Sequence, residues 1–410
     1  MKLAVVSPSV DRRHGTERAL AELLDRLARD YHCEIHLYSQ RVADLRLDQK
    51  LVDSKTNHSA PSRGQEQGKT IWHKVPAIPG PHLAQFLFWL LSNAFCRWWN
   101  RTLNGLRFDL VLSPGINCFD ADVVLVHALF RRLRELASDG SHWQGISGLF
   151  RHLHRRAYYS FLTWLERRIY ANQRVSLAAV SGRTASLLKD YFRRDDVRVI
   201  PNGVDVAHFC PEKRLALREE ERFRLNFRKN DFVLLLIGND LRNKGLPTVL
   251  AAMAAGLEFP LYLLVAGQDA TGPSFYQAAR ALGVSDRCRW DTTSVDSIHL
   301  YAAVDVYVSP TREDSFGLPV LEAMACGLPV IASVNAGVSQ IITDGADGFV
   351  LKDPNDAAML ARHLKNLYEY PDLRLRIGEK ARSTAEAYTW DRNAQAVWEL
   401  LNEIASKKQV

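Results

Sequence analysis

The feature that most constrains the fold is an alternation of short β-rich runs with helical segments, which occurs twice along the chain. Residues 2–9, "KLAVVSPS", form an apolar run that ends in a polar turn, and residues 17–30 place alanines and leucines on one helical face. A second apolar run, "CEIHLYSQ" at 33–40, follows. A strand-helix-strand unit of this kind implies a parallel sheet with helices on its faces. The first half is therefore predicted to be an α/β domain.

The same alternation starts again after residue 231. The runs "FVLLLIGND", "LYLLVAG", "VDVYVSP" and "LPVIAS" are separated by helical segments, which predicts a second parallel sheet. A polar run of alternating charge, 211–231, separates the two sheet-forming regions. We expect two Rossmann-like domains, 1–205 and 206–390, and a final helix over 391–410. A chain of 410 residues is long enough for two such domains.

Charge is distributed unevenly between the halves. Residues 1–205 hold 30 Lys and Arg against 20 Asp and Glu, whereas the remainder holds 23 against 26. Within the basic half, "RHLHRRAYYSFLTWLERRIY" at 151–170 interleaves arginine with aromatic residues. Such a face suits an anionic membrane surface or a phosphorylated acceptor. The alternative is a solvated helix face with its aromatic side chains in the core. We expect no nucleic-acid partner.

Three observations bear on the compartment. The six cysteines form no C-x-x-C pair, which favours a reducing cytoplasm over a disulfide framework or a zinc site. The start of the chain, "MKLAVVSPSV", is expected to be a buried strand and not a signal peptide. The apolar stretch 82–99 is too short to span a bilayer, so we expect a buried helix, the alternative being an amphipathic helix on a bilayer. The predicted location is cytoplasmic, with peripheral contact at the inner membrane face as an option.

Loops that follow parallel strands carry the residues suited to binding a ligand. In "SPTREDSFGLPVLEAMACG", a strand runs into a loop, and Pro319 suits the first turn of the next helix. Free amide groups at that helix start, from Phe316 to Val320, would bind an anion such as phosphate. Asp314 and Glu322 could then accept hydrogen bonds from hydroxyls on either side of the phosphate. That pattern fits a nucleotide sugar. The alternative is that both acids only stabilise the helix dipole.

Further candidates lie in other loops after strands. "IGNDLRNKGL" places Arg242 and Lys244 after the first strand of the second sheet, where they would neutralise a diphosphate. Gly15 would let the backbone approach a ligand at the start of the first helix, and His127 ends the strand "DVVLVH". Asp120 and Asp122 form a D-x-D pattern ahead of a strand, which we interpret as incidental, and no metal site is predicted.

These motifs, together with "PNGVD" at 201–205, "SLAAVSGRTASLL" at 176–188 and "DGADGFVL" at 344–351, resemble those of the retaining glycosyltransferases of family 4. The resemblance implies the GT-B architecture, in which two Rossmann-like domains face each other across a cleft and the C-terminal helix returns to the first domain. It covers most of the chain in the family's order.

The resemblance also implies roles for the candidate residues. Asp314, where the family has Glu, would lie near the donor sugar, and Glu322 would bind the ribose. Lys244 and the less closely matched Arg242 would contact the diphosphate, as would the backbone near Gly15. His127 would lie near the transferred sugar, which makes Asp314, Lys244 and His127 the implied catalytic residues. The implied donor-binding segment at the helix start is Ser315, Phe316, Gly317 and Leu318.

"IGNDLRNKGL" and "PGINCFDADV" look most similar to the lipopolysaccharide core glucosyltransferases of that family. The resemblance implies transfer of a hexose, with glucose favoured, from a nucleoside diphosphate sugar, with UDP favoured, and no other cofactor. The implied acceptor is a glycan or glycolipid of the lipid-linked or lipopolysaccharide type. The alternatives are an epimerase or phosphorylase on the same fold, or a protein that binds nucleotide sugar or nucleic acid without catalysis.

Overall fold

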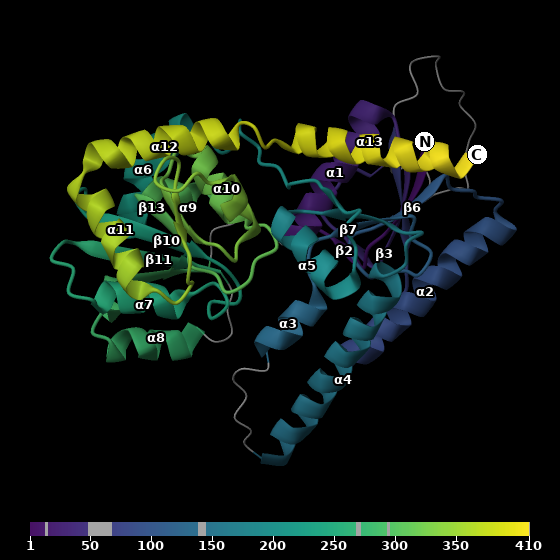
Figure 1. Ribbon diagram of the computed structural model, residues 1–410, viewed down its shortest axis with the longest axis horizontal. Helices are drawn as coiled ribbons and strands as arrows, with labels where there is room; N and C mark the ends of the chain where they lie inside the picture. The colour runs from purple at the N-terminus through teal and green to yellow at the C-terminus, as the bar shows by residue number, and fades with distance from the viewer. Residues whose placement is uncertain (13–14, 48–67, 138–144, 268–271, 293–295, 410) are drawn as a thin grey trace. The chain divides into compact units, whose positions relative to one another are not determined.

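The computed structural model describes residues 1–12, 15–47, 68–137, 145–267, 272–292 and 296–409. It divides the chain into two compact α/β units (Figure 1). Unit 1 comprises Met1–Pro201 and Trp390–Val410, and unit 2 comprises Asn202–Thr389. The boundaries expected from the sequence were 205–206 and 390–391. Each unit has its own parallel sheet and is described by itself.

Unit 1 is built on a seven-stranded sheet in the order β5-β3-β1-β6-β7-β8-β9, and every pairing in it is parallel. The strands are β1 (Lys2–Val6), β3 (Glu34–Ser39), β5 (Lys69–Lys74), β6 (Leu110–Ser113), β7 (Val123–Val126), β8 (Ser176–Ala179) and β9 (Arg198–Val199). A separate parallel pair joins β2 (Ser9–Val10) to β4 (Arg41–Val42). The central strands are apolar and buried on both sides, as the continuous apolar runs predict.

Six helices belong to unit 1, and they pack through regularly spaced apolar residues. In α1, for example, Leu20, Leu23, Leu24 and Leu27 are buried at helical spacing. At α5, the Ser181 hydroxyl accepts a hydrogen bond from the Thr184 amide and caps the helix. The helices are α1 (Gly15–Tyr31), α2 (His82–Leu103), α3 (Phe130–Ala137), α4 (Gly145–Tyr170), α5 (Gly182–Phe192) and α13 (Trp390–Gln409).

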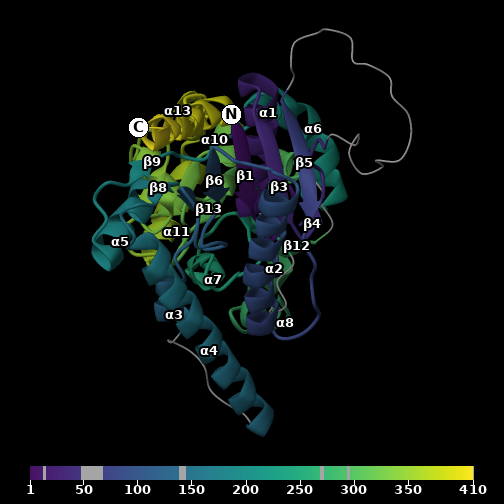
Figure 2. The same ribbon diagram turned by 90° about the vertical axis from the view of Figure 1, so that its right-hand side faces the viewer.

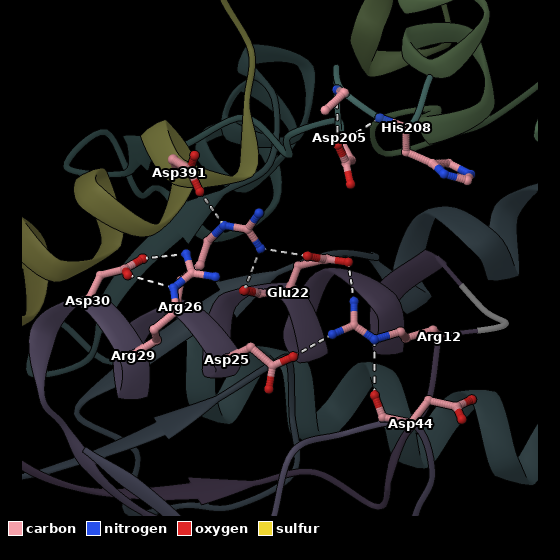
Figure 3. A network of polar contacts seen from close by, with 11 residues as sticks. Arg12, Glu22, Asp25, Arg26, Arg29, Asp30, Asp44, Asp205, His208 and Asp391 are labelled. Atoms are coloured by element: carbon pink, nitrogen blue, oxygen red, sulfur yellow. Dashed lines mark hydrogen bonds and ion pairs between the residues drawn. The ribbon is translucent and has the colours of Figure 1, made fainter. Parts of the chain in front are cut away.

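The C-terminal helix α13 packs against α1. Ala394, Val397, Leu400 and Leu401 of α13 are buried in the same core as the leucines of α1. At the helix surface, Arg26 joins Asp391 at 2.6 Å and Glu22 at 2.5 Å, and Glu22 also pairs with Arg12 (Figure 3). The apolar contact sets the position of α13, because Asp391, the α13 partner of Arg26, has a side chain that is 72% exposed, and ion pairs with such an exposed partner contribute little stability.

Unit 2 has a six-stranded parallel sheet in the order β12-β11-β10-β13-β14-β15. The strands are β10 (Phe232–Ile237), β11 (Leu261–Ala266), β12 (Cys288–Asp291), β13 (Val306–Ser309), β14 (Val330–Ser333) and β15 (Phe349–Leu351). The helices are α6 (Pro211–Arg224), α7 (Leu246–Ala254), α8 (Gly272–Ala281), α9 (Ile298–Ala303), α10 (Leu318–Ala325), α11 (Ala357–Glu369) and α12 (Pro371–Ala385). Short 3₁₀ turns, η2 (Ser285–Arg287) and η3 (Gly337–Ile341), complete the unit.

Four local features of the structure were not expected from the sequence. The polar run at 211–231 contains helix α6, which packs against α9, and its buried Arg222 donates to the carbonyls of Ala303 and Asp231. Strand β5 was not predicted. The composition of 53–70 and 137–148 predicts loops; residues 53–67 and 138–144 lie outside the described residues, whereas 69–70 belong to β5 and 145–148 to α4.

The fourth concerns α2, which is not the buried helix expected over 82–99. It buries Trp89, Leu90, Asn93 and Arg97 but leaves large apolar side chains exposed on the opposite face. Among the residues that the structure describes, we find no helix with the length and apolar character needed to cross a membrane.

A chain of polar contacts between β3, β5 and α2 fixes two neutral histidines. Asn100 Nδ2 donates to His73 Nδ1 at 3.2 Å, His73 Nε2 lies 2.8 Å from His36 Nδ1, and His36 Nε2 lies 2.9 Å from Glu34. One set of tautomers satisfies every contact, with each ring donating through Nε2. Burial, followed by the neighbouring His36, lowers the pKa of His73 to about 4.

This cluster predicts loss of stability at acid pH. The folded protein keeps His73 neutral, whereas the unfolded chain takes up a proton below its ordinary pKa of about 6.5, so the free energy of unfolding falls as the pH drops from 7 to 5. In urea unfolding, the free energy of unfolding of wild type should fall between pH 7 and pH 5 by about 1 to 2 kcal/mol more than that of His73→Gln. The exposed-residue control His82→Gln should behave as wild type. An equal pH dependence in wild type and His73→Gln would contradict the assignment.

Candidate functional site

The candidate site in unit 2 lies where β10 and β13 end. These neighbouring strands pair in parallel, so the loops that follow them, 238–245 and 310–317, meet at the same edge of the sheet. The loops are joined directly, because Asn243 Nδ2 donates to the Glu313 carbonyl at 2.8 Å and the Arg312 amide donates to the Asn243 carbonyl at 2.7 Å. Side chains from two separate sequence motifs are thereby fixed next to each other.

Lys244 forms an ion pair with Asp314 across these loops. Both side chains are largely buried, with exposed fractions of 23% and 17%. The aliphatic stem of Lys244 lies over Gly238, where a Cβ atom would stand only 2.5 Å from Lys244 Cγ. The glycine therefore leaves the space that the lysine side chain needs to reach the loop after β13.

Arg242 and Lys244 occupy the same tight turn but present their side chains differently. The Lys244 amide donates to the Asp240 carbonyl at 2.8 Å and the Gly245 amide to the Arg242 carbonyl at 3.2 Å. The Arg242 side chain is exposed to solvent. The predicted pair is close in sequence, but only Lys244 is seen paired with an acid of the second loop.

The loop before α10 is anchored on its other side by the segment after β14. The Asp314 amide donates to the Asn335 carbonyl at 3.1 Å, and the Gly337 amide donates to the Asp314 carbonyl at 2.9 Å. Gly317, the residue before α10, has φ +99°, a conformation that L side chains rarely adopt. Helix α10 begins at Leu318 with Pro319 in its first turn, where proline's lack of an N–H has no cost.

Asp314 has contacts through both carboxylate oxygens. Oδ2 faces Lys244, and Oδ1 accepts a hydrogen bond from the Phe316 amide at 3.2 Å. The expectation of free amides was wrong for Phe316, whose amide is engaged within the loop, and for Val320, whose amide donates to the Gly317 carbonyl at 3.0 Å. Phe316 itself is buried, and its carbonyl accepts from the Val338 amide at 2.6 Å. The predicted segment from Ser315 to Leu318 is thus held rigidly at the start of α10.

Glu322 is buried about one turn into α10, with an exposed fraction of 3%. Its Oε2 accepts hydrogen bonds from the hydroxyls of Tyr301, at 2.8 Å, and Ser297, at 3.2 Å. The Tyr301 hydroxyl also lies 3.0 Å from the Pro319 carbonyl. Burial, followed by the charge of Glu322, raises the pKa of Tyr301 well above its usual value, so the phenol stays protonated and can donate. Two residues of the α9 region thereby fix the orientation of this carboxylate.

The two candidates of unit 1 lie at the carboxyl edge of its sheet. Gly15 is the first residue of α1, which follows β1 and β2, and His127 directly follows β7. Strand β6 lies between β1 and β7 in the sheet. His127 is half-buried, and desolvation lowers its pKa to about 4, so its imidazole is neutral at physiological pH.

A buried acid that the sequence analysis missed holds the segment after His127. Glu166 of α4 accepts hydrogen bonds from the amides of Phe130, at 2.5 Å, and Arg131, at 2.9 Å, which open α3. Burial raises the pKa of Glu166 to about 7. The residues 127–130 are therefore fixed between the end of β7 and a capped helix start.

The D-x-D pattern has structural contacts. Asp120 pairs with the buried Arg97, and Asp122 accepts from the Val111 amide at 2.8 Å and pairs with Lys408 at 2.8 Å. Within the described ranges, no cluster of three or more His, Cys, Asp or Glu side chains could hold a metal ion.

Two family models match the chain in succession. The model for glycosyltransferase family 4 matches residues 13–208, and the model for glycosyl transferases group 1 matches residues 217–384. Residues 13–208 thus carry a glycosyltransferase family 4 domain, and residues 217–384 carry a glycosyl transferases group 1 domain. The second match contains Lys244, Asp314 and Glu322, and the first contains Gly15 and His127.

Several relatives of this chain are named as glycosyltransferases. The D-inositol 3-phosphate glycosyltransferase of Salinispora tropica is 30% identical over 252 residues, which are 56% of this chain and 51% of that protein. The putative glycosyltransferase EpsD of Bacillus subtilis is 32% identical over 197 residues, which are 47% of this chain and 51% of that protein. The chain thus aligns with about half the length of these relatives.

Solved structures confirm the GT-B fold. WaaG, a glycosyltransferase involved in lipopolysaccharide biosynthesis, superposes with a TM-score of 0.71 at 19% identity, over 97% of this chain and 99% of that one. Sucrose-phosphate synthase from Thermosynechococcus elongatus gives 0.74 at 20% identity, over 99% of both chains. Anabaena HepE in complex with UDP-glucose gives 0.68 at 18% identity, over 98% of this chain and all of that one.

The close contact between Gly238 and Lys244 is testable with UDP as the probe. If the site binds UDP, Gly238→Ala should weaken that binding at least about tenfold, because the methyl group displaces the lysine side chain from the loop after β13. Calorimetric titration of wild type, Gly238→Ala, Lys244→Ala and the double variant would measure this. The methyl group should have little further effect once Lys244 is removed. An equal loss in both backgrounds would show that the glycine acts in some other way.

Proposed function

We propose that the protein transfers a hexose, with glucose favoured, from a nucleoside diphosphate sugar to an acceptor hydroxyl, with retention at the anomeric carbon. UDP is the favoured nucleotide, and the favoured acceptor is a lipid-linked or lipopolysaccharide-type glycan. The proposal needs no metal ion and no cofactor besides the donor. The proposed place of action is the cytoplasm, in peripheral contact with the anionic inner face of a membrane through the basic N-terminal domain.

The observation that carries the proposal is the meeting of Lys244, Asp314 and the start of α10 at one edge of the sheet. A diphosphate placed there would face the lysine ammonium and the positive end of the helix dipole. Asp314 and Glu322 lie on the same short segment and would accept hydrogen bonds from hydroxyls of the sugar and the ribose. A nucleoside diphosphate sugar presents these groups in that order.

The proposed transfer step requires mainly the stabilisation of negative charge on the leaving diphosphate. When the bond between the anomeric carbon and the phosphate oxygen breaks, negative charge grows on the diphosphate, and Lys244, Arg242 and the amides that open α10 would stabilise it. The departing phosphate oxygen can take the proton of the acceptor hydroxyl on the same face of the sugar, which gives retention. This arrangement supplies with fixed protein groups the positive charge that a metal ion would otherwise provide.

The Lys244–Asp314 pair balances the charges of the site. Burying the lysine charge without a partner would be costly, so Asp314 neutralises it until the diphosphate binds. The ammonium has three donors and can be shared between the carboxylate and a phosphate oxygen. Asp314 would thereby orient the lysine while its other oxygen holds the loop.

The neutral state of His127 fits a hydrogen-bonding role. An imidazole with a pKa of about 4 carries no charge at physiological pH, so it can donate to or accept from a sugar hydroxyl without acting as a cation. Fixing of residues 127–130 through Glu166 would hold that ring in a defined position.

The names of related proteins support the proposed classes of donor and acceptor. HepE is seen with UDP-glucose, which supports UDP-glucose as the donor. The relatives named for inositol 3-phosphate and for lipopolysaccharide biosynthesis both indicate acceptors in an anionic setting. An excess of basic residues in 1–205 suits such an acceptor.

Removal of Lys244 tests the proposed role of the site. Lys244→Ala should lower turnover at least about a hundredfold, because losing one such charge-stabilising contact costs about 2.7 to 4 kcal/mol in the transition state. Release of UDP from UDP-glucose, measured with and without acceptor, is the assay, and circular dichroism checks the fold. The exposed control Lys229→Ala should match wild type. Near-normal turnover of folded Lys244→Ala would refute the assignment.

The orientation of Glu322 by Tyr301 can be tested through the ribose. Tyr301→Phe removes the 2.8 Å hydrogen bond to the carboxylate, so the preference for UDP over 2′-deoxy-UDP should shrink about three- to tenfold while turnover at saturation changes little. Competition against UDP-glucose measures both affinities. Tyr276→Phe, at an exposed tyrosine of α8, is the control. A uniform weakening of both nucleotides would indicate only a structural role.

A further inference from the structure

Helix α2 carries apolar side chains on two opposite faces. The inner face is buried in unit 1, where Trp89, Leu90, Asn93 and Arg97 pack or bond. The other face is exposed, and we call it the outer stripe of α2. It consists of Leu87, Leu91, Phe95, Trp98, Trp99 and Leu103, with exposed fractions between 39% and 72%.

The outer stripe is continuous and regular. Its members recur at intervals of three and four residues, so they line one side of the helix over about 24 Å. Phe95 contacts Trp98 and Trp99, with ring centroids 5.8 Å apart in both pairs. The aromatic rings therefore pack on one another at the surface and not into the core. A row of six large apolar side chains exceeds the isolated exposure that is normal on a protein surface.

Helix α4 extends the same kind of surface beside α2. The two helices run in the same direction and touch through His82 with Tyr158 and Phe86 with Phe161, and α4 begins well beyond the start of α2 (Figures 1 and 2). Phe161 also stacks on Trp164, which is 54% exposed. Leu153 of α4 is likewise exposed, at 51%.

The exposed charged side chains described on α2 and α4 themselves are all basic. Helix α2 contains no Asp or Glu, and the one carboxylate of α4, Glu166, is buried at the start of α3. Among the side chains that the structure describes on the two helices, the exposed cations are Arg101, Arg155, Arg156, Arg167 and Arg168. Exposed leucine, phenylalanine and tryptophan combined with arginine is the composition of helices that lie in the interface of an anionic bilayer.

We propose that the outer stripe of α2 inserts into the headgroup region of an anionic membrane, with the arginines of α4 on the lipid phosphates. A second copy of the chain is a poorer occupant, because a two-fold contact through this face would bring like charges together. The inference rests on the proposed function in one respect: membrane insertion would hold the protein where a lipid-linked acceptor resides. A tryptophan side chain in the headgroup region places its apolar ring towards the lipid chains and its N–H towards water, which are the environments that these groups prefer.

Vesicle binding tests the inference. Wild type should co-sediment with vesicles of phosphatidylglycerol and phosphatidylcholine, much less with phosphatidylcholine alone, and less at high salt. The triple variant Leu91→Gln, Phe95→Gln and Trp98→Gln should bind at least about tenfold more weakly, since burial of even one such side chain is worth about that factor. The matched control is Phe223→Gln, at an 85% exposed phenylalanine of unit 2, and it should bind as wild type.

Two parallel measurements separate the outcomes. Release of UDP from UDP-glucose without acceptor or vesicles should be the same in the triple variant and wild type, which shows that the variant is folded. The inference would be overturned if the triple variant bound vesicles as tightly as wild type. It would also be overturned if wild type did not bind vesicles but formed a dimer in solution that the triple variant does not form. Vesicle binding without any UDP release would instead leave the inference standing and refute the proposed function.

Discussion

The parallel pairing of β10 with β13 is the constraint on which the candidate site depends. Its register sets Leu234 beside Val306 and Leu235 beside Tyr307, so the two strands end at the same edge. The loops that follow are then close enough for Asn243 to bond to the backbone of 312 and 313. Lys244 and Asp314 meet because of this pairing, although 70 residues separate them in the sequence.

Packing around that edge makes the site rigid before any ligand binds. Gly238 leaves room for the lysine stem, the loop before α10 is bonded to the segment after β14, and Glu322 is held by two hydroxyls. Lys244, Asp314 and Glu322 therefore each have a bonding partner within the protein. Groups arranged in this way need little reorganisation when charge develops on a leaving group, and this is the main source of rate enhancement in such sites.

Much of the fold follows from local patterns. The apolar runs predicted the central strands, and proline near residue 319 predicted the start of α10. Local patterns failed where long-range packing decides. The polar run that became α6 is helical because its arginines bond to carbonyls near α9, and β5 is a strand because it pairs with β3. In α2, the apolar stretch was expected to be buried, but a single sheet face can cover only one side of a helix.

In the candidate site, too, local sequence patterns predict some features and long-range packing decides the others. The sequence alone determined which residue types follow the strands, and so it identified Lys244, Asp314, Glu322 and His127 from their positions after or near strand ends. Only the tertiary structure decided their partners. Tyr301 and Ser297 lie 21 and 25 residues from Glu322, and Glu166 lies 36 and 35 residues from the two residues whose amides it holds. The helical and strand periodicities of a sequence do not predict contacts between residues so far apart. Their contacts arise only when helices and strands pack, because hydrogen bonds between side chains depend on distances that the fold alone sets.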